Sequence, residues 1–346
     1  MKQSLLSVHP ERILIRSTNW IGDAIMTTPA IRTIRDNFPQ AEITILVKPW
    51  VADVFTASPD IDKVILFQKD GAHQGFQGLW QLARELRACR FDLAILLQNA
   101  FEAALLVRLA QIPVRAGYNR DARGLLLTHP VKLGRTDPGT HQVTYYQDLL
   151  RELGLTCSPT ELHLSLPKPV LRWAKQFLAR LGGKPVVGLN PGAAYGPAKC
   201  WPAEKYGQLA ARLHARFSAE ILVFGTPKDA QAAAVIKNAA PEHVTDLTGR
   251  TKLAEAMALI ASCQAFITND SGLMHVGAAL KTPLVAIFGS TDPVATGPYS
   301  QNAVVVQKDL PCRPCLKTHC QTDFACMEEI GVDEVYEATA RLLTSL

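Results

Sequence analysis

The segment Thr268–His275, which reads TNDSGLMH, combines residue types suited to binding an anion. It lies between two short apolar runs typical of buried strands, and a helix is predicted from Gly272 to Leu280. Ser271 or Asp270 can cap this helix, and the free N–H groups of its first turn attract negative charge. His275 lies in the same turn and can reach the same anion. A capped helix with a structural histidine explains these residues equally well. The other motifs of the chain are therefore needed to choose between the two interpretations.

A second loop with phosphate-binding character follows the apolar run 185–189. It reads NPGAAYGPAKCWP from Asn190 to Pro202. Its small residues let the main chain close around a phosphate, and Lys199 supplies a positive charge. The alternative is a flexible surface loop with a solvated lysine. A further glycine-rich turn, Phe224–Asp229, either contacts a ribose or is only a tight turn.

The first strand-like run of the chain ends in STNWIGDAIMTTP, Ser17–Pro29. Gly22 and Asp23 begin a helix there, and the helix dipole and main-chain N–H groups keep a carboxylate in that place ionised at neutral pH. Asp23 is therefore expected to be a general base at the rim of the cleft between the domains, with a plain helix-capping aspartate as the alternative.

Together the motifs describe a pyrophosphate site with a base opposite it. A glycosyltransferase that uses a nucleotide-diphospho sugar needs both, because the leaving group must be neutralised and the acceptor hydroxyl must lose its proton. Two other nucleotide-binding classes are excluded. The chain has no GxGxxG after its first strand and no GxxxxGK[ST] anywhere, which argues against a Rossmann dehydrogenase and a P-loop NTPase.

Strand-like and helix-like segments that alternate along the whole chain must position these loops. Such alternation predicts parallel sheets with helices on both faces. The expected strands are 12–15, 42–47, 63–67, 92–97 and 114–118, and then 185–189, 220–224, 244–247, 265–267 and 284–288. The main expected helices are 23–37, 50–56, 79–88, 100–110, 143–153, 170–181, 203–217, 272–280 and 332–343.

Proline-rich stretches at 156–159 and 166–169 divide this pattern, so we place the boundary between two domains there. The predicted domains are 1–165 and 166–346, two α/β doubly wound folds that face each other. We expect the last helix to belong to the second domain or to pack back on the first.

The composition fits two globular domains and a small acidic ligand. The chain has 346 residues, of which 48% are hydrophobic, a formal net charge of +5 and a sequence pI near 8.7. This charge falls short of a nucleic-acid footprint, and no run approaches the ~18 apolar residues of a membrane span. The start carries no apolar signal region, so we expect a cytoplasmic protein with reduced thiols.

Four of the eight cysteines are clustered near the end of the chain, at Cys312, Cys315, Cys320 and Cys326. This spacing, with His319 inside it, fits a structural Zn²⁺ site, one or two disulfides, or four free thiols. We expect the cluster to organise its loop and to take no part in the chemistry.

The motifs also carry a resemblance to a known family. In segments 17–29, 190–202, 268–280 and 288–293 the chain resembles the bacterial lipopolysaccharide heptosyltransferases, and within them it is most similar to the type II enzymes. The resemblance implies a GT-B fold of two facing Rossmann-like domains. It also implies inverting transfer of L-glycero-D-manno-heptose from ADP-heptose to the inner core of lipopolysaccharide, with no cofactor required for catalysis.

By the same resemblance, Asp23 is the catalytic base and Lys199 the catalytic phosphate ligand. The residues expected to bind ADP-heptose are Asn190, Pro191, Gly192, Lys199, Thr251, Asp270, Ser271, Gly272 and His275. Of these, Thr251 is expected near the adenine.

The implied acceptor is an anionic glycolipid, so basic residues are expected on the first domain. The candidates lie in one loop-rich stretch after the fifth strand and are Arg115, Arg120 and Arg123, with a solvated basic loop as the alternative. We expect peripheral contact with the inner face of the inner membrane. The aromatic residues that either make this contact or pack inside are Trp50, Phe55 and Phe76.

Three other functions stay open. The chain could be a type I enzyme or have another acceptor specificity in the same family. It could be an epimerase or hydrolase of nucleotide sugars. It could also be a zinc-binding interaction protein built around the cysteine cluster.

Overall fold

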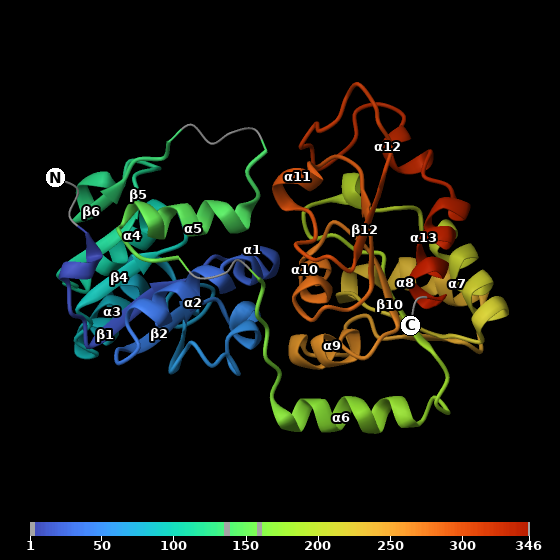
Figure 1. Ribbon diagram of the computed structural model, residues 1–346, viewed down its shortest axis with the longest axis horizontal. Coiled ribbons are helices and arrows are strands. Elements are labelled where there is room, and N and C mark those ends of the chain that lie inside the picture. The colour runs from blue at the N-terminus through green and yellow to red at the C-terminus, as the bar shows by residue number, and fades with distance from the viewer. Residues whose placement is uncertain (1–3, 135–138, 158–160, 345–346) are drawn as a thin grey trace. The chain divides into compact units, whose positions relative to one another are not determined.

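The computed structural model describes residues 4–134, 139–157 and 161–344, and it separates into two compact units, Met1–Ser165 and Leu166–Leu346. Figure 1 shows the first unit in blue to green and the second in green to red. Of the expected linker residues, Ser158 and Pro159 lie outside the described residues. Lys168 and Pro169 already belong to the first helix of the second unit.

The first unit is built on a six-stranded parallel sheet with the strand order β3-β2-β1-β4-β5-β6. The strands are β1 (Arg12–Arg16), β2 (Glu42–Val47), β3 (Lys63–Leu66), β4 (Leu93–Leu96), β5 (Val114–Tyr118) and β6 (His129–Val131). The central strands are continuous apolar runs whose side chains are buried on both faces, as expected of a parallel sheet covered by helices.

The second unit repeats this topology, with the strand order β12-β11-β10-β7-β8-β9. Its strands are β7 (Val186–Asn190), β8 (Glu220–Val223), β9 (Val244–Asp246), β10 (Ala265–Asn269), β11 (Leu284–Phe288) and β12 (Ala303–Gln307). In each unit the first and fourth strands are neighbours, so the strand order reverses between β1 and β4 and between β7 and β10. Ligands of doubly wound folds bind outside the carboxyl ends of the strands at this point.

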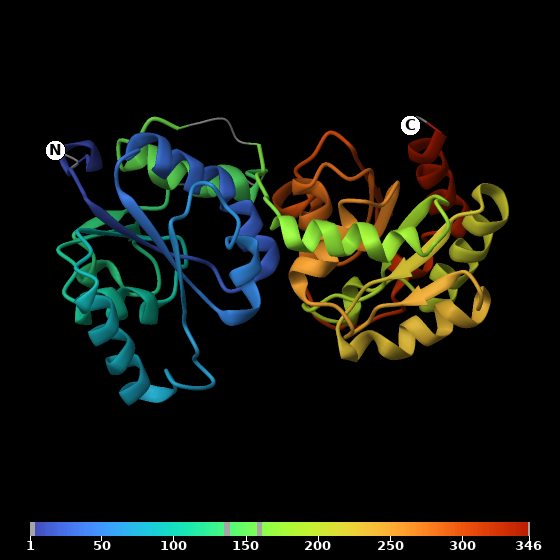
Figure 2. The same cartoon turned by 90° about the horizontal axis from the view of Figure 1, so that it is seen from below.

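Helices cover both faces of each sheet (Figure 2). In the first unit α2 packs on α5 and α3 packs on α4, while in the second α7 packs on α8 and α13, and α6 on α9. The helices of the first unit are α1 (Ile21–Met26), α2 (Thr28–Asn37), α3 (Gly75–Ala88), α4 (Phe101–Leu109) and α5 (Gln142–Glu152). Those of the second are α6 (Lys168–Ala179), α7 (Ala203–Phe217), α8 (Ala230–Ala239), α9 (Leu253–Ile260), α10 (Gly272–Ala279), α11 (Pro293–Thr296), α12 (Ala325–Glu328) and α13 (Val332–Thr344). Short 3₁₀ turns are η1 (Leu5–Ser7), η2 (Pro49–Val54), η3 (Gly124–Leu126), η4 (Pro197–Lys199) and η5 (Pro227–Asp229).

The predicted α/β class is confirmed, and all ten predicted strands are present. The sequence patterns miss β6 and β12, which each close one edge of a sheet. Pro130 interrupts the three-residue β6, and β12 is half exposed, so neither strand shows the buried run that marks the others. The expected helix 50–56 is instead the 3₁₀ turn η2.

The single helix predicted at 23–37 is wrong, because the chain forms α1 and α2 there. Pro29 has no N–H and cannot continue a helical hydrogen-bond ladder. The hydroxyls of Thr27 and Thr28 donate instead to the carbonyls of Ala24 and Ile25, at 2.6 and 2.7 Å. The short α1 therefore ends one turn after Asp23.

No helix in the described ranges is both long and apolar enough to cross a membrane.

Candidate functional site

A connected polar cluster of the second unit lies at the carboxyl ends of β7 and β10, where the strand order reverses. Asp270 follows β10 directly and is 4% exposed. Its Oδ2 accepts hydrogen bonds from Lys199 Nζ at 2.5 Å and from Thr291 Oγ1 at 2.6 Å. A buried carboxylate is costly unless it is paired and hydrogen-bonded, and these two donors meet that need. The contacts join the loops after β7, β10 and β11.

Asn190 and Ser271 connect the loop after β7 to the start of α10. The Asn190 amide donates to Thr268 Oγ1 and to Ser271 Oγ, both at 2.9 Å. Ser271 is the N-cap of α10, and its hydroxyl accepts from Met274 N at 3.3 Å. The first turn of α10 is therefore held next to the Asn190 loop, with its positive dipole end at the carboxyl edge of the sheet. His275 is buried in this helix.

Asn269 fixes the rest of the Asn190–Pro202 loop. Its amide donates to the Pro191 carbonyl at 2.6 Å, while its Oδ1 accepts from Trp201 N and from the Tyr206 hydroxyl, both at 3.1 Å. The side chain of Trp201 is fully buried and donates to the Ile330 carbonyl at 3.0 Å. The loop is therefore anchored at both ends, and its lysine is paired with Asp270.

At Gly192 any larger residue would require the Asp229 side chain to move. A Cβ at this position would lie 2.3 Å from an Asp229 carboxylate oxygen. That carboxylate accepts from the N–H and the hydroxyl of Thr226, at 2.7 and 2.8 Å, and fixes the turn after β8. Thr251, the residue expected near the adenine, is half-buried before α9.

The loop that carries the cysteines packs on the Lys199 loop. The Tyr195 ring lies over Lys199 Nζ at 4.7 Å from its centroid, and its hydroxyl donates to the Leu316 carbonyl at 2.6 Å. Ala198 N donates to the Thr318 carbonyl at 3.1 Å. In the other direction, Leu316 N donates to the Ser290 carbonyl at 2.8 Å, next to Thr291. The cysteine loop thus supports two of the three loops that meet at Asp270.

Asp23 lies in the first unit, in the first turn of α1 at the carboxyl end of β1. Its side chain is partly exposed, and α1 packs against α5 and η2. Burial raises the pKa of the Tyr146 phenol in α5 well above its ordinary value, and the nearby Asp23 carboxylate raises it further. The Tyr146 phenol therefore stays protonated near this turn, and the role of Asp23 as the base stays a prediction.

Comparison with known proteins is decisive at this point. The family model described as glycosyltransferase family 9 (heptosyltransferase) matches residues 79–325. The chain belongs to this family. It is 32% identical over 307 residues to lipopolysaccharide heptosyltransferase 2 of Salmonella typhimurium, covering 86% of this chain and 88% of that protein. The family resemblance and the glycosyltransferase class read from the motifs are therefore confirmed.

Solved structures agree with this assignment. The structure of the Escherichia coli ADP-heptose lipopolysaccharide heptosyltransferase II is 29% identical, covers 96% of this chain and 99% of that chain, and superposes with a TM-score of 0.83. The GT-B fold predicted from the family resemblance is confirmed. Lipopolysaccharide heptosyltransferase 3 of Escherichia coli is also similar, at 29% identity over 292 residues, 82% of this chain and 84% of that protein. The comparisons thus establish the heptosyltransferase family but not one acceptor type.

Two of the three arginines expected to bind the acceptor of this heptosyltransferase are used inside the first unit. Arg123 is completely buried, and its guanidinium donates to the carbonyls of Tyr118 and Gln98. The Arg115 guanidinium donates to the Leu126 and Ile112 carbonyls, at 2.8 and 2.5 Å. These contacts give both side chains a role in holding main-chain turns. Arg120 is exposed, and the acceptor role of the group stays a prediction.

Sequence reasoning missed two other basic residues, Arg16 and Lys48, which are buried at the carboxyl ends of β1 and β2. Each directly follows a buried apolar run, and this position is a signal that the sequence does contain. Of the aromatic residues considered for membrane contact, Trp50 and Phe76 are exposed, whereas Phe55 is buried in the core and cannot make such a contact.

All eight cysteines are free thiols. In the cluster, Cys312, Cys315 and Cys320 lie near enough to Cys326 for their charges to raise the pKa of its thiol, which burial raises first. Among the described residues, the group of at least three potential metal ligands with ligand atoms within 4.8 Å of one another is instead His214, Glu220 and His243. A zinc ion at the cysteine cluster therefore stays a prediction.

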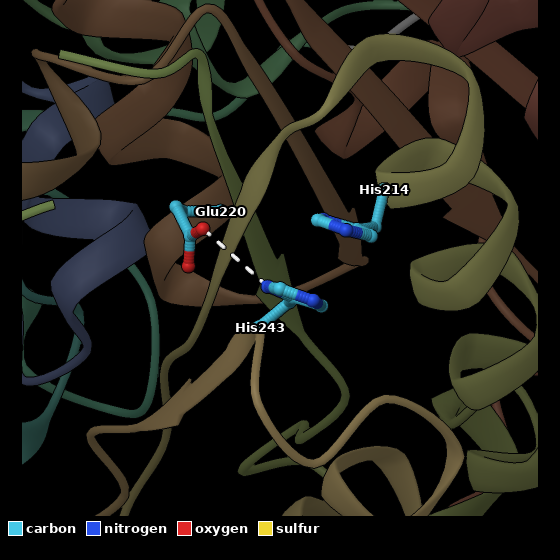
Figure 3. Close-up of side chains that lie close together, drawn as sticks. All are labelled: His214, Glu220 and His243. Carbon is cyan, nitrogen blue, oxygen red and sulfur yellow. Dashed lines mark ion pairs between the residues drawn. The ribbon is translucent and has the colours of Figure 1, made fainter. Parts of the chain in front are cut away.

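The His214 group lies at the amino ends of β8 and β9 (Figure 3). Asp270 follows the carboxyl end of β10, so it lies at the opposite end of the parallel strands. The two imidazole rings are stacked, with centroids 3.4 Å apart and planes inclined by 8°. A metal ion binds in the plane of each imidazole ligand, and two parallel planes at this spacing share no such point. Glu220 is moreover paired with Lys184 at 2.7 Å. As folded, the group is a histidine stack beside an ion pair and not a preformed metal site.

Proposed function

We propose that the protein is an inverting heptosyltransferase of type II, which moves L-glycero-D-manno-heptose from ADP-heptose to the inner core of lipopolysaccharide. The observation that carries this proposal is the cluster of Lys199, Asp270 and Thr291 beside the capped start of α10. A helix start and a lysine at the switch point of a doubly wound sheet suit a diphosphate. The related enzymes named above support the sugar and the acceptor, and the type 2 relatives support type II.

The second unit binds the donor. The diphosphate of ADP-heptose is bound by the N–H groups of the first turn of α10 and by Lys199, while Asn190, Pro191 and Gly192 shape the adjoining loop. Lys199 must exchange part of its contact with Asp270 for a phosphate oxygen. Thr291 keeps a hydrogen bond on Asp270 during this exchange, so the carboxylate is not left without a partner.

The first unit binds the acceptor, and Asp23 takes the proton from the acceptor hydroxyl as that oxygen attacks the anomeric carbon of heptose. The bond from this carbon to the phosphate oxygen breaks, and ADP leaves with the bonding electron pair. Attack from the side opposite ADP inverts the anomeric centre. Lys199 and the positive end of α10 stabilise the charge that develops on the departing diphosphate.

We further propose that the protein acts at the cytoplasmic face of the inner membrane, because its acceptor is a glycolipid. The exposed Trp50 and Phe76 support peripheral contact, since aromatic side chains favour the membrane interface. Cosedimentation with anionic vesicles tests this, and loss of binding in a variant with both residues changed to Ser is the expected result.

The test of function is ADP release from ADP-heptose with a panel of core acceptors that differ by one heptose. Transfer of heptose to one member of the panel is the expected result, and the acceptor that is extended assigns the type. Free heptose and ADP without acceptor would show a hydrolase. No ADP release with any acceptor, from a folded protein that binds ADP, would contradict the proposal.

A further inference from the structure

Two basic side chains are buried at the carboxyl edge of the first sheet. Arg16 is the last residue of β1 and is 1% exposed, and Lys48 directly follows β2 and is 4% exposed. β1 and β2 are parallel neighbours in which Arg16 is paired with Leu46, so both side chains start from the carboxyl ends of these strands. The chain also continues from the carboxyl end of β1 into the turn that carries Asp23.

Neither cation has a carboxylate partner among the described residues. The Arg16 guanidinium donates to the carbonyls of Ser17 and Leu46 and to Asn19 Oδ1. Lys48 Nζ lies 4.1 Å from the centroid of the Phe67 ring and 5.7 Å from that of Trp50. Two carboxylates act on Lys48 from a distance, Glu102 and Asp70, and Glu102 also acts on Arg16. Glu102 forms its ion pair with Lys69.

The two buried charges disfavour each other. Burial lowers the pKa of Arg16 to about 10, and it lowers the pKa of Lys48, on which the charge of Arg16 has a further lowering effect. A buried charge without a counter-ion destabilises the fold, and a bound anion removes that penalty. In the same described segment, the hydroxyls of Ser17 and Thr18 at the end of β1 are buried without a hydrogen-bond partner. They are further groups able to donate to an anion.

We propose that Lys48, supported by Arg16, binds an anionic group of the acceptor, a phosphate or a carboxylate, at the carboxyl end of β2. The proposal rests on the proposed function, because it assigns part of that acceptor to the first unit. Trp50 follows Lys48 in η2, and its indole N–H donates to the Asn19 carbonyl at 2.9 Å. η2 also packs against α1, which carries Asp23. An anion at Lys48 is thus tied to the turn that holds the base, and it orients the acceptor there.

The competing explanation is that Lys48 is a structural cation held by the faces of Phe67 and Trp50. The two explanations differ for Lys48→Met and Lys48→Arg. Met keeps the length and the apolar contacts but has no charge, whereas Arg keeps the charge. Lys63→Met is a matched control. The Lys63 side chain is 62% exposed and pairs with Glu42, and it lies at the amino end of β3, away from the carboxyl ends of the strands.

The first measurement needs no turnover. The melting temperature of the full chain is measured with inorganic phosphate and, separately, with malonate, at constant ionic strength and with saturating ADP present to occupy the proposed donor site. A rise is expected for the unchanged protein, for Lys48→Arg and for Lys63→Met, and it is expected to be absent in Lys48→Met. A rise of equal size in Lys48→Met would overturn the proposal. A response to phosphate alone or to malonate alone identifies the chemical class of the anion.

The second measurement is steady-state transfer with intact acceptor and with enzymatically dephosphorylated acceptor. The acceptor KM of Lys48→Met is expected to rise about 10- to 100-fold, the range of a charged hydrogen bond, while the donor KM stays within about twofold. If the anion is a phosphate, dephosphorylation raises the KM of the unchanged protein but not that of Lys48→Met. If it is a carboxylate, dephosphorylation has no effect on either. An unchanged acceptor KM in Lys48→Met would reject the assignment. If no acceptor is extended at all, the proposed function fails while the phosphate and malonate measurements still decide the anion site.

Discussion

The two sheets have the same strand order, yet the polar residues at their carboxyl ends balance charge in different ways. In the second unit Lys199 and Asp270 neutralise each other within a network of amide and hydroxyl groups. In the first unit Arg16 and Lys48 are buried among carbonyls and aromatic rings, without a carboxylate partner in the described part of the chain. One topology therefore supports a compensated site and an uncompensated one.

This difference sets what each ligand must do. A donor diphosphate has to compete with Asp270 for Lys199, so it gains less from the charge but finds the lysine already in place. An anion at Lys48 competes with no carboxylate, so its binding stabilises the first unit directly. The pair of Lys199 and Asp270 therefore favours a fixed position of the lysine, whereas the unpaired Lys48 favours high affinity for an anion. Each of the following variants tests one side of this comparison.

Asp23→Asn has the largest expected effect, because it removes the base from the first unit and keeps the shape of the side chain. The rate of heptose transfer at saturating substrates should fall about 10²- to 10⁴-fold. ADP affinity, measured by calorimetry, should not change. Asp36→Asn, an exposed substitution in α2, is the matched control and should keep the full rate. Transfer by Asp23→Asn within a few-fold of the unchanged protein would show that the chemistry does not depend on this turn.

Lys199→Met breaks the compensated pair and leaves Asp270 buried without its cation. We expect a loss of about 3 kcal/mol in the free energy of unfolding and a fall of about 10²-fold in turnover. Urea denaturation measures the first and steady-state kinetics the second. Adding Asp270→Asn should recover most of the stability, since the uncompensated carboxylate is gone, but not the turnover. Full activity in either variant would reduce Lys199 to a structural role.

The fold was largely predictable from the sequence, and the charge balance was not. Buried strands such as 284–288 are marked by continuous apolar runs, so the alternating pattern identified ten strands and the position of the loops. The half-exposed β12 has no such run, and a helix pattern across Thr27–Pro29 hides the break between α1 and α2. Motif residues such as Lys199 and Asp270 could be named, but not their ion pair, because residues 71 positions apart meet only through the sheet order. Lys48 was missed although it directly follows an apolar run, because that position alone does not show that the lysine is buried.

The cysteine loop is expected to supply part of the fixed geometry of the second unit, through Arg313. Its guanidinium donates to the carbonyls of Gly289, Lys308 and Thr291. These bonds position Thr291, whose hydroxyl donates to Asp270. Arg313→Gln should lower kcat/KM for the donor about tenfold and leave the acceptor KM unchanged, with Arg313→Lys recovering part of the loss.

A control for this variant lies in the same loop. Cys312→Ser with Cys315→Ser should keep the transfer rate, because the hydrogen bonds from this loop to the loops at Asp270 are made by other residues and the chemistry needs no thiol. Loss of turnover in the cysteine variant comparable to that of Asp23→Asn, with the fold intact, would assign the cluster a part in the reaction.

At alkaline pH two buried groups outside the proposed donor site, Cys263 in the second unit and Lys48 in the first, should change stability with opposite sign. Cys263 lies in the second unit, where burial raises the pKa of its thiol to about 12 from an ordinary 9. A pKa raised by folding means that the folded state keeps the proton longer, so the stability gained from this thiol is complete below pH 9 and is lost as the pH rises toward 12. At pH 10 the loss of unfolding free energy relative to pH 8 is about 1.4 kcal/mol.

The pKa of Lys48 is lowered by burial, so the unfolded state binds more protons and that residue makes the first unit more stable as the pH rises. Urea denaturation at pH 8 and pH 10 should therefore show a smaller loss of stability with pH in Cys263→Ala and a larger one in Lys48→Met. The same pH dependence in both variants would mean that these buried groups are not what distinguishes the two sheets at high pH.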